Sequence, residues 1–96
     1  MNQKNKHMSV ALEQTLSLTL FGRQDCHLCH DMILALRNLQ KQTLFELLII
    51  DIDTQPELAV QYGEKVPVLV STHTNEEICH HFLDLAALDD YLSKFR

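Results

Sequence analysis

The sequence predicts a single α/β domain in which helices flank a four-stranded mixed sheet. Apolar side chains alternate with polar ones in the first patterned segment, and they then recur at steps of three and four. These spacings are the periods of a strand and of a helix, respectively. Three further strand-like runs and two further helical patterns complete the order β-α-β-α-β-β-α, in which a parallel βαβ unit precedes a hairpin and a helix.

The first predicted strand covers residues 15–20, where leucines alternate with threonine and serine. Residues 22–25 form a short polar turn, and a helix is predicted from Cys26 onward. The apolar face of this helix consists of side chains spaced three or four positions apart. They are Cys29, Met32, Ile33, Leu36 and Leu39.

The second predicted strand runs from Phe45 to Ile50, an almost continuous apolar run that is typical of a strand covered on both faces. It ends at Asp51 and Asp53. We expect these carboxylates to form the turn and to start the next helix, although either one is also a candidate proton acceptor.

The second helix is predicted to begin at Thr54, which acts as the capping residue, with Pro56 in its first turn. Gly63 is its expected end, as a residue in the left-handed conformation. The helix between these two signals is short.

The third strand is predicted over Val66–Val70, with Pro67 inside it, and the fourth over Ile78–Phe82. Residues 72–75 form the turn between these strands. Asp84 is predicted to cap the last helix, whose apolar residues share one face. Those residues are Leu85, Leu88, Leu92 and Phe95.

The domain organisation is simple. Residues 1–14 are polar and lack apolar periodicity, so we expect a flexible N-terminal tail before a single domain over residues 15–96. A chain of 96 residues is long enough for one core and for no second domain. We expect no signal peptide and no membrane-spanning segment, because no apolar run is long enough for either.

Charge and cysteine content narrow the function classes. Eight Lys and Arg against thirteen Asp and Glu give a formal net charge of -5, so nucleic acid and anionic membrane surfaces are not expected partners. Three cysteines, two of them close together, do not suit a secreted domain that is stapled by disulfides. We therefore expect a cytoplasmic protein.

The motif that carries chemistry is a pair of cysteines, Cys26 and Cys29, at the predicted strand-to-helix junction. Backbone N–H groups at a helix N-terminus lack partners and carry partial positive charge, which stabilises a thiolate at Cys26. Cys29 lies one turn further on, close enough to form a disulfide. Arg23 and His27 are candidates to stabilise the thiolate, whereas Asp25 opposes it by like-charge repulsion.

Other uses of these residues remain open. Residues 26–30 also fit the C-x-x-C-H pattern of c-type haem attachment, which the expected absence of export disfavours. A zinc site normally needs a second spaced pair of ligands, and His80 and His81, adjacent on a strand, should point to opposite faces. A purely structural role is the interpretation that we favour for the lone Cys79.

The order of the motifs along the chain is also informative. Leu18–Phe21 leads to the cysteine pair, Ile50–Leu58 and Tyr62-Gly63 follow, and Val66–Leu69 comes last. In this order they resemble the thioredoxin superfamily, and within it the glutaredoxin-like branch of small, poorly characterised proteins. The resemblance spans about residues 15–95 and implies a thioredoxin-like fold.

The resemblance also implies roles for individual residues. It makes Cys26 the attacking cysteine and Cys29 the resolving one. It makes Pro67 the family's cis-proline, with Val66 offering its backbone to an extended substrate. Arg23 matches the basic position that precedes the motif in glutaredoxins.

One feature of glutaredoxins is missing. Two glycines and an aspartate after their last strand help to hold glutathione, whereas residues 77–84 here contain the aspartate, Asp84, and no glycine. We therefore treat glutathione as a candidate co-substrate and expect no bound cofactor and no metal.

The leading hypothesis is a monomeric dithiol–disulfide oxidoreductase that acts on disulfide-containing or glutathionylated proteins and is recycled by a cellular reductant. Two alternatives are kept. One is a non-catalytic module of the same fold that binds an extended peptide, and the other is a metal-binding protein.

Overall fold

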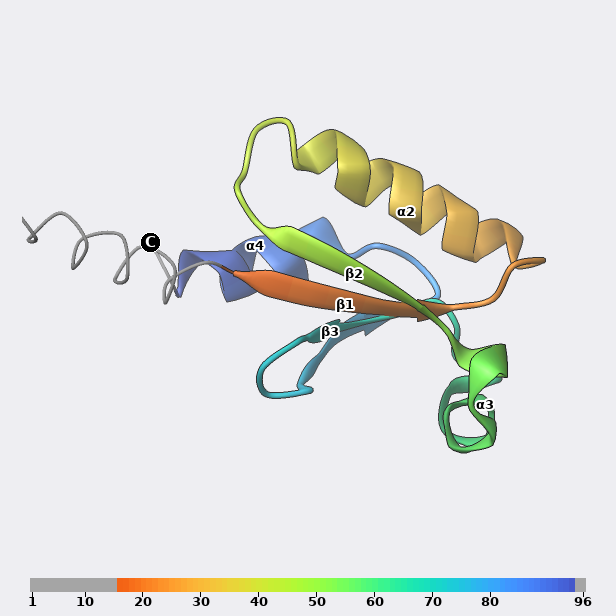
Figure 1. Cartoon of the computed structure of the whole chain (residues 1–96). Coiled ribbons are helices and arrows are strands. Elements are labelled where there is room, and N and C mark those ends of the chain that lie inside the picture. Colours follow the sequence, from red (N-terminus) through yellow and green to blue (C-terminus); the bar gives the residue numbers. More distant parts are fainter. Residues whose placement is uncertain (1–15, 95–96) are drawn as a thin grey trace, which may run out of the picture.

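The computed structural model describes residues 16–94 and has the expected element order (Figure 1). The predicted tail over residues 1–14, together with Thr15 and Phe95, lies outside the described residues. The strands are β1 (Ser17–Gly22), β2 (Glu46–Asp51), β3 (Val68–Ser71) and β4 (Glu77–His80). The helices are α2 (His27–Leu39), α3 (Pro56–Tyr62) and α4 (Leu85–Ser93), with a short 3-10 helix, η1 (Ile52–Thr54), before α3.

The four strands form one mixed sheet in the order β2-β1-β3-β4. Strand β1 is parallel to β2 and antiparallel to β3, and β3 is antiparallel to β4. Leu20 of β1 lies between Ile49 of β2 and Leu69 of β3. The predicted mixed sheet and thioredoxin-like fold are therefore confirmed.

Helices cover both faces of this sheet, and α2 and α3 lie on opposite sides of it (Figure 1). Leu20 of β1 points into the core beneath α2 and α4. The next residue, Phe21, points to the other face and stacks on Tyr62 of α3, with ring centroids 4.4 Å apart. Alternate side chains of one central strand thus contribute to two cores.

The predicted helical face of α2 is confirmed. Cys29, Met32 and Leu36 are buried, whereas Ile33 and Leu39 are partly buried at the edge of the same core. The spacing of three and four positions therefore identified the side chains that face the sheet.

The prediction that the second strand is covered on both faces is wrong. Strand β2 lies at an edge of the sheet, and its Leu48 and Ile49 are 47% and 44% exposed. Strand β3 is buried along its whole length, and so is strand β1. Its hydroxyl side chains are satisfied there, because Ser17 and Thr19 both hydrogen-bond to Thr72 Oγ1, at 2.9 and 2.8 Å.

The start and the end of α3 also differ from the prediction. Thr54 belongs to η1, where its hydroxyl donates to the Asp51 carbonyl oxygen, and Gln55 is the capping residue of α3. Gly63 is right-handed, with φ of -53°. Close approach explains the glycine better than its conformation does, since a Cβ at Gly63 would lie 2.5 Å from the Ala59 carbonyl oxygen.

The last part of the chain keeps the predicted turn and cap. The turn after β3 ends at Asn75, and Asp84 caps α4 by accepting a hydrogen bond from the Ala87 N–H at 3.0 Å. Strand β4 stops at His80, short of the predicted Phe82, because the chain turns at the next residue.

The buried face of α4 begins later than predicted. Leu88 and Leu92 are buried as expected, but Leu85 is 62% exposed. Tyr91 takes part in the core in its place, and its hydroxyl donates to Ser71 Oγ at 2.7 Å.

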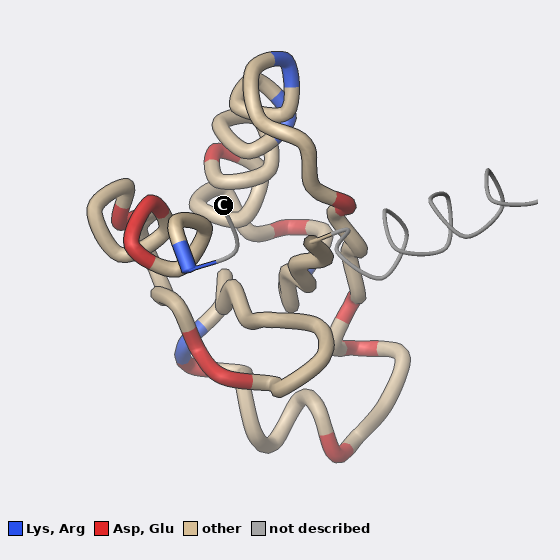
Figure 2. The backbone as a smooth tube through the Cα atoms, turned by 90° about the vertical axis from the view of Figure 1, so that its left-hand side faces the viewer, with Lys and Arg blue, Asp and Glu red and all other residues tan. Residues whose placement is uncertain are grey.

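Charged positions are spread over the described part of the chain. Figure 2 shows the Lys and Arg positions at several separate places along the backbone, among more numerous Asp and Glu. None of the helices within residues 16–94 combines the length and the apolar character that crossing a membrane requires.

The packing of α2 leads to a first prediction. Leu36 is fully buried, so Leu36→Ala should lower the free energy of unfolding by about 2–5 kcal/mol through lost burial and a residual cavity. Leu34 on the same helix is 69% exposed, and Leu34→Ala should change it by less than about 0.5 kcal/mol. Urea unfolding of both variants measures the difference, and equal effects would contradict the packing described above.

Candidate functional site

The candidate site is built around the start of α2. Cys26 is the capping residue of this helix, with an extended backbone, and it forms a disulfide with Cys29. The Cα atoms of the two cysteines are 5.2 Å apart. The Cys29 N–H donates to Cys26 Sγ at 3.1 Å, so the Cys26 sulfur accepts one of the hydrogen bonds that the first turn of a helix leaves unmade.

The two cysteines differ in their access to solvent. Cys29 is fully buried against the sheet, whereas Cys26 is half-buried. Gly22, at the end of β1, makes the burial of Cys29 possible, because a Cβ there would lie 3.2 Å from Cys29 Sγ. Cys29 also lines a cavity of about 250 Å³ between α2 and β2.

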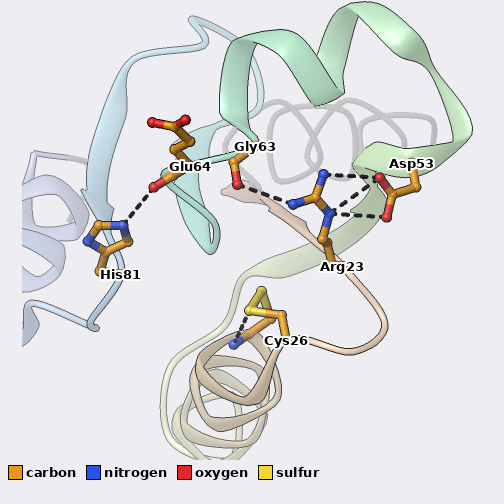
Figure 3. The surroundings of a disulfide bond; sticks show 7 residues. Arg23, Cys26, Asp53, Gly63, Glu64 and His81 are labelled. Atoms are coloured by element: carbon orange, nitrogen blue, oxygen red, sulfur yellow. Dashed lines mark hydrogen bonds and ion pairs between the residues drawn. A yellow bond between two sulfur atoms is a disulfide. The ribbon is translucent and has the colours of Figure 1, made fainter.

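The residues from Gly63 to Pro67 connect α3 to β3, and Gly63 and Glu64 lie in the surroundings of the disulfide (Figure 3). The peptide bond between Val66 and Pro67 is cis, and Pro67 is fully buried. The Val66 N–H donates to the Tyr62 carbonyl oxygen at 3.1 Å. This internal bond occupies the backbone N–H of Val66.

Arg23 connects the loop before α2 to η1 and to the end of α3. Its guanidinium contacts both carboxylate oxygens of Asp53, with Nε 3.1 Å from Oδ2, and Nη1 donates to the Gly63 carbonyl oxygen at 3.2 Å. The hydrogen bond with Asp53 is the main reason why the pKa of Arg23 is raised. In Figure 3 the guanidinium points toward Asp53 and Gly63, so its role in stabilising a thiolate stays a prediction.

The two aspartates after β2 have different roles. Asp51 Oδ1 accepts a hydrogen bond from the Asp53 N–H at 2.9 Å, which is the predicted turn-forming role. The pairing of Asp53 with Arg23 was not predicted. The two residues are thirty positions apart, and no local pattern in the sequence indicates that they meet.

His27 lies on the outside of the first turn of α2, with a side chain that is 91% exposed. Its Nε2 is 4.0 Å from Asp31 Oδ2, one helical turn away. The predicted role of His27 toward the thiolate stays a prediction.

The histidines at the end of β4 do not point to opposite faces, as a regular strand would require. His81 has φ of 65°, and this turn brings its ring to an edge-on contact with the His80 ring, with centroids 4.7 Å apart. Within residues 16–94, no cluster of three or more His, Cys, Asp or Glu side chains is arranged to hold a metal ion.

Cys79 is a buried, free cysteine in the core beneath α4, as predicted. Burial raises the pKa of its thiol, so this cysteine is less readily ionised than an exposed one. Its position in β4 separates it from the disulfide pair at the start of α2.

Fold and site together define a class. A four-stranded mixed sheet between helices, with a Cys-x-x-Cys pair at the start of the first helix described, is the arrangement of a thioredoxin-fold protein. The chain belongs to the glutaredoxin-like domain family (DUF836), whose family model matches residues 17–93.

Solved structures agree with this assignment. Protein Ne2328 from Nitrosomonas europaea is 43% identical, with a TM-score of 0.73, over 80% of this chain and 91% of that one. Protein XcR50 from X. campestris is 31% identical, with a TM-score of 0.63, over 80% and 96%. A thioredoxin from Fasciola hepatica, 18% identical with a TM-score of 0.60 over 97% and 94%, shares the fold. No protein with a curated description matches the sequence.

A charged cluster beside the site gives a pH-dependent prediction. Glu77 contacts Lys65 Nζ through Oε1, at 3.0 Å, and His80 Nδ1 through Oε2, at 2.7 Å. The pKa of Glu77 is lowered from 4.5, mainly by the hydrogen bond from His80. The carboxylate therefore contributes stability that is complete above about pH 4.5 and is lost as the pH falls through the lower pKa of the folded state.

Glu77→Gln should accordingly lower the free energy of unfolding by about 0.2–1 kcal/mol at pH 6, as expected for exposed ion pairs. The difference from the wild type should shrink as the pH falls through the lowered pKa of Glu77. Glu76→Gln, at an exposed neighbouring position, is the matched control and should change little at either pH. Urea unfolding at pH 6 and pH 3 measures this, and an undiminished difference at pH 3 would show that the charge of Glu77 is not its cause.

Proposed function

We propose that this protein is a small dithiol–disulfide oxidoreductase that uses the Cys26–Cys29 pair to reduce disulfide-containing or glutathionylated proteins. One observation carries the proposal: the two cysteines form a disulfide at a helix N-terminus, with Cys26 half-buried and Cys29 fully buried. This difference in access supports Cys26 as the attacking residue and Cys29 as the resolving one.

The exchange proceeds in two steps that conserve sulfur, protons and electrons. The Cys26 thiolate attacks one sulfur of the substrate disulfide, forms a mixed disulfide and releases the other substrate sulfur as a thiolate, which takes up a proton. Cys29 then loses its thiol proton, attacks the Cys26 sulfur as a thiolate and releases the second substrate sulfur as a thiolate, which takes up a proton. Two electrons have passed to the substrate, and Cys26 and Cys29 are joined as they are in this structure.

The start of α2 favours the first step. Only the thiolate attacks, and a cysteine with an ordinary pKa of about 8.5 is roughly 3% ionised at pH 7. The Cys29 N–H and the partial positive charge of the helix N-terminus stabilise negative charge on Cys26 Sγ. Lowering the pKa to about 7 requires roughly 2 kcal/mol of such stabilisation.

The segment before β3 is the proposed docking place for the substrate. An extended chain can add to a free edge through main-chain hydrogen bonds. Because the Val66 N–H is bonded to Tyr62, we assign the docking contact to the Val66 carbonyl oxygen, which accepts a hydrogen bond from the substrate backbone.

The catalytic cycle needs a reductant to reopen the Cys26–Cys29 disulfide. Two molecules of glutathione or one protein dithiol supply the two electrons in the proposed cytoplasmic setting. Equilibration of the purified pair with glutathione buffers, and separately with a dithiol buffer, measures which of the two reductants reacts.

Single cysteine variants test the proposed roles. Cys26→Ser should abolish disulfide reductase activity, because the remaining Cys29 is fully buried and does not reach a substrate disulfide. Cys29→Ser should lose turnover and accumulate a mixed disulfide with the substrate, visible as a mass increase that a reductant reverses. Cys79→Ser is the control and should retain activity, since Cys79 lies in the core. Full turnover in both Cys26→Ser and Cys29→Ser would refute the proposal.

The reactivity of the reduced pair separates an enzyme from a passive peptide-binding module. We expect the alkylation rate of Cys26 by iodoacetamide to rise with a midpoint between about pH 6 and 8, below the ordinary value of about 8.5. The rate is measured on Cys79→Ser, so that one thiol dominates. A midpoint at or above about 8.5, combined with no turnover of disulfides, would favour the binding module.

A further inference from the structure

His81 has a backbone conformation that is uncommon for residues other than glycine. It follows directly after β4, and its φ of 65° lies in the left-handed region that favours glycine. Glycine would supply this turn with less strain. The structure therefore raises the question of what the imidazole side chain provides at this position.

Two hydrogen bonds connect His81 to the segment 64–67 before β3. Its backbone N–H donates to the Pro67 carbonyl oxygen at 2.8 Å, and its ring Nε2 lies 3.1 Å from the Glu64 carbonyl oxygen. A carbonyl oxygen only accepts, so Nε2 carries the proton and donates. The two acceptors stand at the two ends of the segment, with Val66 between them.

Neighbouring contacts support the same segment. The His80 ring packs edge-on against His81 and bonds to Glu77, which in turn contacts Lys65 Nζ. On the other side, Arg23 donates to the Gly63 carbonyl oxygen. Figure 3 shows His81 and Arg23 approaching the chain around Gly63 and Glu64 from opposite sides.

We propose that His81 is a positioning residue that fixes segment 64–67 beside the cysteine pair and so orients the Val66 carbonyl oxygen for an extended, disulfide-bearing peptide. This inference rests on the proposed function, because it assigns the determinant of how a peptide substrate docks at the same site. His81 acts through the backbone of the segment, and the ring bond to Glu64 is the part that glycine cannot replace.

Two amide variants that differ by one methylene test the ring bond. His81→Gln keeps an N–H donor at about the reach of Nε2, whereas the shorter side chain of His81→Asn keeps the polarity and tolerates positive φ but does not reach Glu64. His81→Gly adopts this φ freely and removes the ring altogether, so it separates the loss of the ring from any loss of folding caused by backbone strain. Thermal unfolding establishes that each variant is folded.

Reductase kinetics use two substrates, a disulfide-bonded extended peptide and bis(2-hydroxyethyl) disulfide, which has no backbone to dock. We expect His81→Asn and His81→Gly to raise KM for the peptide roughly two- to tenfold, the equivalent of one net hydrogen bond, with kcat within about twofold. His81→Gln should restore the KM of the wild type. The small disulfide should react equally well with all variants.

The inference is overturned if His81→Asn and His81→Gln have the same peptide KM as the wild type, or if both substrates are affected equally. If the wild type reduces neither substrate, the proposed function is refuted. Hydrogen exchange then tests the positioning role of His81 separately. The Lys65 and Val66 amides, both bonded to Tyr62, should then exchange faster in His81→Asn than in His81→Gln, and equal rates overturn the role.

Discussion

The hydrogen bond from the Cys29 N–H to Cys26 Sγ joins the local structure of the chain to its chemistry. A helix that starts beside a buried sheet needs an acceptor for its first N–H groups, and here the acceptor is a sulfur atom. Cys26, whose sulfur caps α2, is also the more exposed of the two cysteines. Under the proposed function, the atom that caps the helix is therefore also the atom that attacks the substrate.

The sheet places this helix start beside the segment that precedes β3. Strand β1 is buried along its length between β2 and β3, so its end is fixed, and the short loop after Gly22 leaves little freedom to Cys26. Because β3 is antiparallel to β1, the first residue of β3 lies beside the last residues of β1, at the same end of the two strands. Arg23 and Asp53 then connect that end to η1.

Sequence patterns predicted those elements whose burial follows from their own periodicity. The face of α2, the cap of α4 by Asp84 and the cysteine pair at a strand-to-helix junction are all local features. The exposure of Leu48 and Ile49 was missed, because a run of apolar residues does not reveal that its strand lies at the edge of the sheet, where both faces are only partly covered.

Contacts between distant residues account for the other differences. The need for glycine at position 63 comes from the close approach of the Ala59 carbonyl oxygen. The prediction considered only the left-handed conformation that often ends a helix, and so it missed this contact. The contact of His81 with Glu64 depends on a left-handed residue where a strand was expected to continue. The absence of glycine from residues 77–84 was visible in the sequence, and it was the signal that this loop differs from that of glutaredoxins.

Within residues 16–94, no strand pairs with the outer edge of β2, and this has a consequence for solubility. An unpaired strand with exposed Leu48 and Ile49 is a template onto which a second chain can add. In an antiparallel pairing of two copies about the middle of β2, Glu46 of each copy would stand opposite Asp51 of the other, and like charges in that position repel. The two acidic residues at the ends of the strand thus oppose self-association through charge repulsion, and acidification weakens this repulsion.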